Sequence, residues 1–163
     1  MDSTLPFGVT DGRQAFTDAI RALLLQLPES APREVWMIDS TFDSWPLDEP
    51  AVLDALGAWL RPAGRQLTIV ANDFSAVQQR FPRFAAWRRL RVHAIAAWQP
   101  TPEDNVQLTA QLLAESGAVE LLDVARWRAR QVSSRSDLRS LNENAGTLLR
   151  RCQTAWPATT VGL

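Results

Sequence analysis

The chain has 163 residues and a formal net charge of −1, with 46% hydrophobic and 21% charged residues, a composition typical of one globular domain. All 17 basic residues are arginine, and neither lysine nor tyrosine occurs. This excludes Schiff-base catalysis, a lysine-containing phosphate loop and Ser-Lys or Tyr-Lys catalytic pairs. Because the chain contains one histidine, His93, and one cysteine, Cys152, it also excludes an intrachain two-histidine site and an intrachain disulfide.

Targeting signals are not evident in the sequence. Residues 1–4 lack the basic flank and apolar core of a signal peptide, and no apolar run approaches the roughly 20 residues that span a bilayer. We therefore expect a cytoplasmic protein that makes no contact with a membrane.

The chain begins with a segment, residues 1–11, that we expect to be an irregular arm, and residues 12–163 are expected to form a single α/β domain. Apolar residues at helical spacing predict a first helix from Gly12 to Leu27, which Pro28 is expected to end. The continuous apolar run Glu34–Asp39 is typical of a strand that is covered on both faces.

Helices and strands then alternate. A second helix is predicted over Pro50–Leu60 and a second strand over Gln66–Ala71. Helical pattern resumes over 75–90 with a restart at Pro82, and Arg91–Ala96 is predicted to be a third strand. This β-α-β-α-β order predicts a mixed, mainly parallel sheet with helices on both faces.

The segment that follows has two interpretations. Val106–Glu115 contains good helix formers, but it also alternates in polarity and meets Ser116-Gly117 before a second apolar run, Val119–Val124. We favour a β-hairpin that turns at Ser116-Gly117 over a helix. A last amphipathic helix is predicted over Leu138–Trp156, with Pro157 ending it.

Polar residues follow the first two predicted strands and form the main candidate site. Asp39 and Ser40 follow the first strand, and Asn72 and Asp73 follow the second. Ligands of open α/β sheets bind at the carboxyl ends of parallel strands, so paired carboxylates there could hold a divalent ion or act as acid and base. The alternative is that Asp39 and Asp73 cap the turns or helices that follow them.

His93 and an arginine-rich segment are further candidates. Within the third predicted strand, we expect His93 to be a neutral, hydrogen-bonded core or interface residue, which could meet its own copy across a two-fold axis. The segment from Arg80 to Arg91 interleaves arginines with aromatic residues, as nucleic-acid sites do. Its aromatic residues also fit a buried helical stripe, and the pI of 5.8 disfavours a dedicated nucleic-acid binder. The arginines concerned are Arg80, Arg83, Arg88, Arg89 and Arg91.

Arg126, Arg128 and Arg130 alternate after the predicted hairpin. If the strand continues, their guanidinium groups would share one face and could bind an anion. The alternative is a charged strand edge that prevents aggregation. Trp45 and Trp98 fall in predicted loops, where exposed aromatic residues often mark a partner surface.

The order of elements resembles half of a phospholipase D-like domain, in particular small bacterial proteins of unknown function that are degenerate relatives of that fold. The resemblance covers roughly residues 12–160. It is carried by the opening helix and by four short segments: Val35–Asp39, Leu67–Val70, Glu115-Ser116-Gly117 and Asn142-Glu143-Asn144-Ala145 ahead of Trp156.

In that family a His-x-Lys-x-x-x-x-Asp motif lies on the hairpin, and its histidine attacks phosphorus. Placing the motif's aspartate on Glu115 places its lysine on Ala110 and its histidine on Leu108. Neither residue can attack or stabilise a phosphate, so the resemblance implies a scaffold without phosphodiesterase activity.

The sequence therefore favours a non-catalytic binding protein without cofactors or metals. Its expected partners are a second copy of the chain, as a homodimer, or another protein, with a small anionic ligand as a further candidate. A divergent hydrolase or metal-dependent enzyme using Asp39 and Asp73 is the alternative, and a nucleic-acid accessory protein using Arg80–Arg91 is the second alternative.

Overall fold

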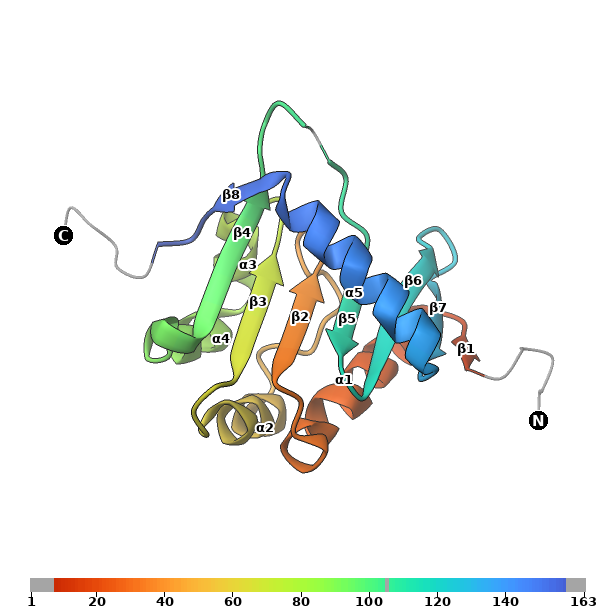
Figure 1. Cartoon of the computed structure of the whole chain (residues 1–163), viewed down its shortest axis with the longest axis horizontal. Helices are drawn as coiled ribbons and strands as arrows, with labels where there is room; N and C mark the ends of the chain where they lie inside the picture. Colours follow the sequence, from red (N-terminus) through yellow and green to blue (C-terminus); the bar gives the residue numbers. More distant parts are fainter. Residues whose placement is uncertain (1–7, 105, 158–163) are drawn as a thin grey trace.

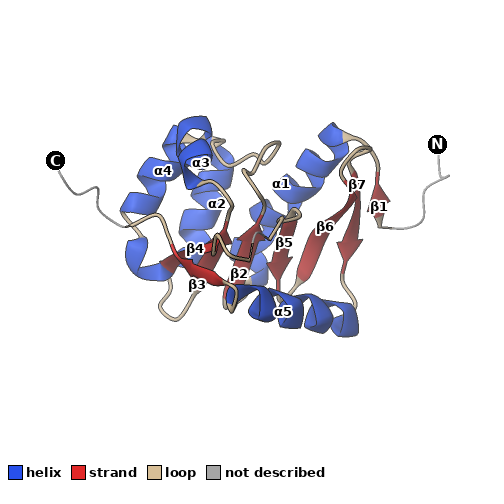
Figure 2. Cartoon of the chain, turned by 90° about the horizontal axis from the view of Figure 1, so that it is seen from above, coloured by secondary structure: helices blue, strands red, loops and turns tan. Residues whose placement is uncertain are grey.

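One mixed β-sheet lies between two helical layers in the computed structural model, which describes residues 8–104 and 106–157. In the described residues the sheet has eight strands in the order β1-β7-β6-β5-β2-β3-β4-β8. Four helices, α1 to α4, cover one face, and α5 lies across the other (Figure 2). None of the helices described here is long and apolar enough to span a membrane.

The parallel part of the sheet is built from β2 (Glu34–Ile38), β3 (Gln66–Val70) and β4 (Ile95–Pro100) (Figure 1). The first two strands match the predicted apolar runs, and in each of them the second, fourth and fifth residues are buried while the middle one is partly exposed. The third predicted strand, Arg91–Ala96, is misplaced. Residues Val92–Ala94 form a short 3₁₀ helix, η1, and the strand begins only at Ile95.

The expectation of a mainly parallel sheet is wrong. Only the β2–β3 and β3–β4 pairings are parallel, and the five other pairings in the described sheet are antiparallel. The reason is that the hairpin of β5 (Gln111–Ala114) and β6 (Gly117–Asp123) returns to the centre of the sheet, where β5 pairs antiparallel with β2. The hairpin itself is confirmed, as opposed to the helical alternative.

Two short strands occupy the edges of the sheet. Val9–Thr10, within the segment expected to be an irregular arm, forms β1 and pairs with β7 (Arg128–Val132). At the other edge, Cys152–Thr154 forms β8 and pairs with β4.

The predicted bounds of the first and the last helix need correction. Helix α1 (Arg13–Ser30) continues past Pro28, and it is capped by Ala31, a left-handed residue whose N–H donates to Leu27 O at 2.8 Å. Helix α5 (Arg135–Leu149) begins after Ser134, which caps it, and ends before the predicted Trp156 because the chain turns to pair with β4. Residues 152–154 therefore pair with the edge strand β4 instead of continuing the predicted helix.

Three other helices agree with the predicted positions: α2 (Pro50–Leu60), α3 (Phe74–Arg80) and α4 (Pro82–Arg89).

The larger core lies between α1–α4 and the sheet and includes Phe16, Phe42 and Trp59, all fully buried. The smaller core lies between the sheet and α5 and includes Ile38, Val70 and Leu141. Trp45, predicted to be an exposed loop residue, is only 3% exposed, and Trp98 lies in β4.

Candidate functional site at the carboxyl edge of the parallel strands

The four predicted site residues after β2 and β3 do lie side by side. Because β2 and β3 are parallel and in register, their carboxyl ends meet at one edge of the sheet. Backbone hydrogen bonds continue the contact beyond the strands: Asp39 N donates to Val70 O at 3.1 Å and Asn72 N donates to Ser40 O at 3.0 Å. The position of these residues follows directly from the register of the two apolar strands.

Asp39 is held by donors within its own loop. One carboxylate oxygen accepts from Ser40 N at 2.7 Å, and the other accepts from Trp45 Nε1 at 2.9 Å. Burial raises the pKa of Asp39 from 3.8 to about 6, and the nearby Asp43 carboxylate acts in the same direction, while the two hydrogen bonds oppose them. Asp39 thereby organises the β2–α2 loop, and its two oxygens already have partners.

Asp73 takes the capping role that was the alternative interpretation. Its exposed carboxylate accepts from Ala76 N at 3.1 Å and so caps helix α3. The carboxylates of Asp39 and Asp73 therefore each serve a different local structure. Across the described residues, no three His, Cys, Asp or Glu side chains are grouped as metal ligands would be.

Asn72 connects the sheet edge to the segment before β5. Its Nδ2 donates to Val106 O at 3.0 Å, and its Oδ1 accepts from Leu108 N at 3.4 Å. One side chain thus fixes both a carbonyl and an amide of a loop that lies 34 to 36 residues further along the chain. Beside it, a cavity of about 310 Å³ is lined by Asn72, Asp73, Ser75, Gln78, Gln99 and Trp156, among other residues.

Comparisons with known proteins show likeness in fold rather than in sequence. No protein-family model matches the sequence, and no curated protein matches it. Among solved structures, TrmBL2, an archaeal chromatin protein with a novel mode of DNA binding, matches at 12% identity and a TM-score of 0.63. That match covers 95% of this chain and 57% of TrmBL2.

Two further structures match over nearly their whole length. Nuc from Salmonella typhimurium, a phospholipase D family member, matches at 14% identity and a TM-score of 0.55, covering 91% of this chain and 98% of Nuc. NucT from Helicobacter pylori matches at 11% identity and a TM-score of 0.53, covering 90% and 97%. The chain has a phospholipase D-like fold.

The resemblance places the family's motif on Leu108, Ala110 and Glu115, which lie at and before the β5–β6 turn. Leu108 is 7% exposed and belongs to the core under α5, whereas Ala110 is 2% exposed and belongs to the core under α1–α4. Glu115, on which the resemblance places the motif's aspartate, lies in the β5–β6 turn and accepts from Arg33 N at 3.0 Å. Leu108 and Ala110, on which the resemblance places the motif's histidine and lysine, are therefore both buried.

The other predicted residues lie away from this edge. His93 is exposed in η1, which precedes β4 and therefore lies at the amino end of the parallel strands. The expected strand position and core burial of His93 are wrong, while an interface role stays a prediction. Arg126 lies in the β6–β7 turn, while Arg128 and Arg130 lie on β7 and pair with Asp11 at 3.6 Å and Glu120 at 2.9 Å. The three arginines therefore do not share one strand, which was the condition for the anion-binding interpretation.

The segment Arg80–Arg91 divides between surface and core. Phe84 and Trp87 are buried, as the helical stripe predicts, so neither ring is presented for base stacking. Arg88 is also buried, 5% exposed; it stacks over Trp156 with 4.0 Å between Cζ and the ring centroid and donates to Trp156 O. Burial lowers the pKa of Arg88 to about 10. Sequence spacing gave no signal for this partnership, because Trp156 is 68 residues away.

Proposed function

We propose that the protein is a non-catalytic, phospholipase D-like module that binds partners rather than cleaving phosphodiesters. The observation that supports this most directly is the burial of Leu108 and Ala110, on which the resemblance places the family's histidine and lysine. Aliphatic groups can neither form a covalent phosphoryl intermediate nor neutralise phosphoryl oxygens.

The remaining polar groups do not replace the missing ones. Asp39 has hydrogen-bond donors on both oxygens, and Asp73 caps α3. The one histidine lies at the opposite end of the parallel strands, beyond the reach of a group bound at the carboxyl edge. No pair of nucleophile and base is therefore assembled among these residues.

The experiment is an assay of bis(p-nitrophenyl) phosphate hydrolysis with and without Mg²⁺ or Mn²⁺. We expect purified protein to hydrolyse the ester no faster than the Asp39→Asn variant or buffer alone. Turnover by the natural sequence that disappears in Asp39→Asn and Asp73→Asn would overturn the proposal and favour the hydrolase or metal-dependent enzyme that uses these carboxylates.

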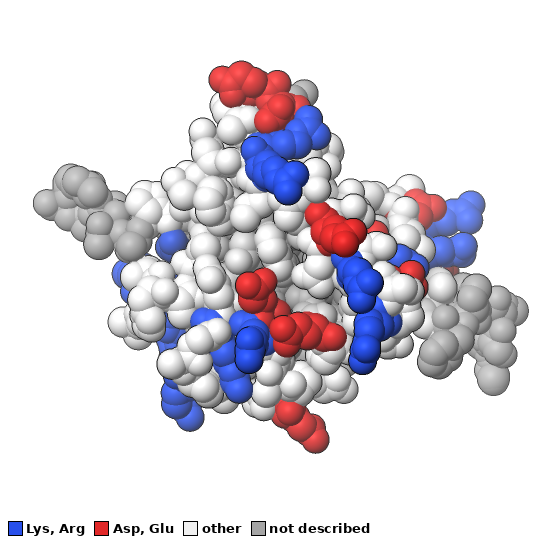
Figure 3. Space-filling view, in the orientation of Figure 1, with Lys and Arg blue, Asp and Glu red and all other residues white. Residues whose placement is uncertain are grey.

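Binding of nucleic acid is a second candidate, because TrmBL2, a structural neighbour, has a described mode of DNA binding. Figure 3 shows the face that carries α5, on which acidic and basic side chains are interspersed rather than gathered into one continuous basic surface. Exposed arginines of α4, Arg83 and Arg89, would have to supply the phosphate contacts.

A salt titration separates this candidate from the main proposal. Binding of a fluorescent 20-base-pair duplex should be absent at 150 mM salt if the main proposal holds. Binding that falls steeply between about 50 and 200 mM salt, and is weakened in an Arg83→Gln/Arg89→Gln variant, would support the nucleic-acid candidate.

We also propose that the module acts in the cytoplasm as a homodimer. Leu122 and Val124 are 52% and 63% exposed, and they lie together at the end of β6 and in the turn that follows it. Exposed large apolar side chains that neighbour one another are a feature of contact surfaces.

A further inference from the structure

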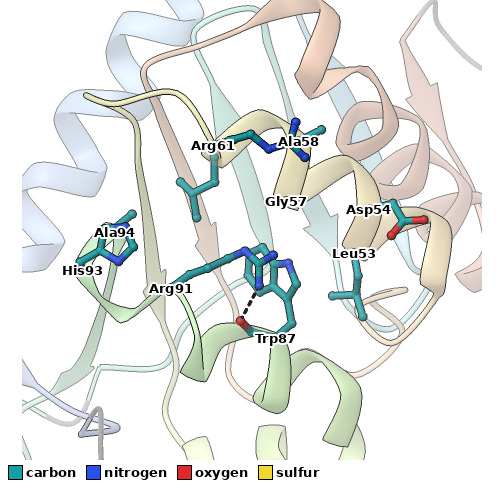
Figure 4. A pocket seen from close by; sticks show the side chains of 10 residues that line it. Leu53, Asp54, Gly57, Ala58, Arg61, Trp87, Arg91, His93 and Ala94 are labelled. Atoms are coloured by element: carbon teal, nitrogen blue, oxygen red, sulfur yellow. Dashed lines mark hydrogen bonds between the residues drawn. The ribbon is translucent and has the colours of Figure 1, made fainter.

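A second cavity lies away from the carboxyl edge, between helices α2 and α4 and the 3₁₀ helix η1. Its volume is about 360 Å³, and Gly57, Arg61, Trp87, Arg91 and His93 are among the residues that line it (Figure 4). Because η1 precedes β4, this cavity lies at the amino end of the parallel strands. Its size falls within the range of small-molecule sites.

Trp87 brings an unused hydrogen-bond donor to this cavity. The residue is 9% exposed, and its indole Nε1 is buried without a hydrogen-bond partner among the described residues. Buried indole N–H groups usually have a partner, because leaving one unpaired is unfavourable. An acceptor that enters the cavity would satisfy this donor.

Arg91 lies across Trp87 and adds further donors, as Figure 4 shows. Its Cζ is 4.7 Å from the ring centroid, and its Nη1 donates to Trp87 O at 3.0 Å. These contacts fix the guanidinium group, but within the part of the chain that the structure describes they occupy only Nη1 among its nitrogens. The Nε–Nη2 edge, which suits bidentate binding of carboxylate or phosphate, is left available.

Gly57 on α2 makes room for both donors. A Cβ atom at this position would lie 3.4 Å from Trp87 Nε1, 3.4 Å from Arg91 Nη2 and 3.9 Å from Arg91 Nε. The indole N–H and the free guanidinium edge therefore converge on the space that the missing side chain leaves beside α2.

The charges around the cavity favour an anion. Arg61 and Arg91 are both basic, and neither has an ion-pair partner among the described residues, while His93 is exposed at the cavity wall. One acidic side chain, Asp54, also lines the cavity and is exposed. Two guanidinium groups against one carboxylate leave a net positive charge.

We propose that this cavity, the α2–α4 site, binds a small organic molecule bearing an oxyanion. The oxyanion accepts from Trp87 Nε1 and from the Nε–Nη2 edge of Arg91, and the organic part contacts Leu53 and Ala94 in the cavity wall. This assignment rests on the proposed function, since it gives the binding module a ligand class.

The test uses the indole N–H signals of the ¹⁵N-labelled protein, which contains seven tryptophans. Phenyl phosphate and benzoate are titrated separately, with benzyl alcohol as the neutral analogue. We expect the Trp87 signal, assigned from a Trp87→Phe variant, to move downfield with one or both anions and to stay in place with benzyl alcohol. The anion that binds more tightly identifies the preferred oxyanion as phosphate or carboxylate.

Variants of the site make the result specific. Gly57→Ala fills the space between the donors while favouring the helix, so it should fold and yet bind about tenfold more weakly or worse. Arg91→Gln should weaken binding similarly. Arg89→Gln is the matched control, since Arg89 is exposed at the end of α4 and does not line the cavity.

Two outcomes would overturn this inference: a Trp87 signal that does not move with either anion at 10 mM, or shifts that are equal in the Gly57→Ala, Arg91→Gln and Arg89→Gln variants. Either would leave the proposed non-catalytic role standing, because that role is tested separately by phosphodiester hydrolysis. Conversely, hydrolysis that depends on Asp39 would remove the non-catalytic role without affecting the indole shifts.

Discussion

Asp39 shows how a residue chosen as a candidate ligand can serve the loop that contains it. Its carboxylate accepts from Ser40 N and Trp45 Nε1, and Trp45 in turn packs on Phe42 with 4.8 Å between ring centroids. The aromatic residues of this loop are therefore buried anchors, and the indole of one of them, Trp45, also donates to the Asp39 carboxylate. Burial without a neighbouring cation is what raises the pKa of this carboxyl.

The raised pKa of Asp39 predicts a pH-dependent contribution to stability. Because its folded pKa, about 6, lies above the unfolded value of 3.8, the folded state holds the proton more tightly, and the contribution is present below pH 4 and lost as the pH rises through 6. Asp39→Asn cannot ionise, so its free energy of unfolding relative to the natural sequence should rise by about 2 to 3 kcal/mol between pH 4 and pH 7.

Urea unfolding of both proteins across this pH range measures the difference. The amide introduced by Asp39→Asn also mismatches one of the two donors, but that cost is the same at every pH and cancels in the comparison. A difference between the two proteins that stays constant from pH 4 to pH 7 would contradict the assignment.

Among the elements, the loop before β5 depends on a strand edge that lies far from it in the sequence. Asn72 holds Val106 O and Leu108 N, and Leu108 then packs into the core under α5. We predict that Asn72→Ala costs about 1 to 3 kcal/mol, since it leaves a donor and an acceptor of this loop without their partner.

Hydrogen exchange provides the specific readout for Asn72→Ala. The Leu108 amide should exchange faster, whereas the amides within β3 should keep their protection, because their ladder to β2 and β4 is intact. An Asp73→Ala variant, which removes a cap of α3 instead, is the neighbouring control and should leave the Leu108 amide unchanged.

Sequence patterns predicted the elements that carry their own signal. The apolar runs of β2 and β3, the Pro50 start of α2 and the turn of the β5–β6 hairpin are all encoded locally. They also placed Asp39 and Asn72 at one edge. Patterns failed where distant pairing decides: β8 forms because β4 offers it an edge, and β1 forms on β7. The predicted mainly parallel sheet was wrong for the same reason, because β5 pairs antiparallel with β2, a strand that lies far earlier in the sequence.

The α2–α4 site was only partly visible in the sequence. Arg91 and His93 were singled out, but for a nucleic-acid surface and a strand interior. No signal in the sequence marked Gly57 or the unpaired nitrogen of Trp87. The two come close together only because helices α2 and α4 pack side by side.

At the scale of the whole molecule, exposed apolar residues give the homodimer proposal its test. Leu122→Ser and Val124→Ser should leave the fold intact, since both side chains are exposed, and should convert a dimer to a monomer in sedimentation velocity. Leu90→Ser is the control, because Leu90 is 78% exposed but follows α4 in another part of the chain. A natural sequence that sediments as a monomer at all concentrations would contradict the dimer.

The partnership of β8 and Trp156 has a practical consequence for shortened forms of the protein. A version that stops after α5 would strip β4 of its outer neighbour and leave its backbone groups open to pairing with other molecules. It would also remove the indole that packs on Phe74 and Phe84 and that lies under the guanidinium group of Arg88. Expression vectors designed for this domain should therefore retain residues 150–157.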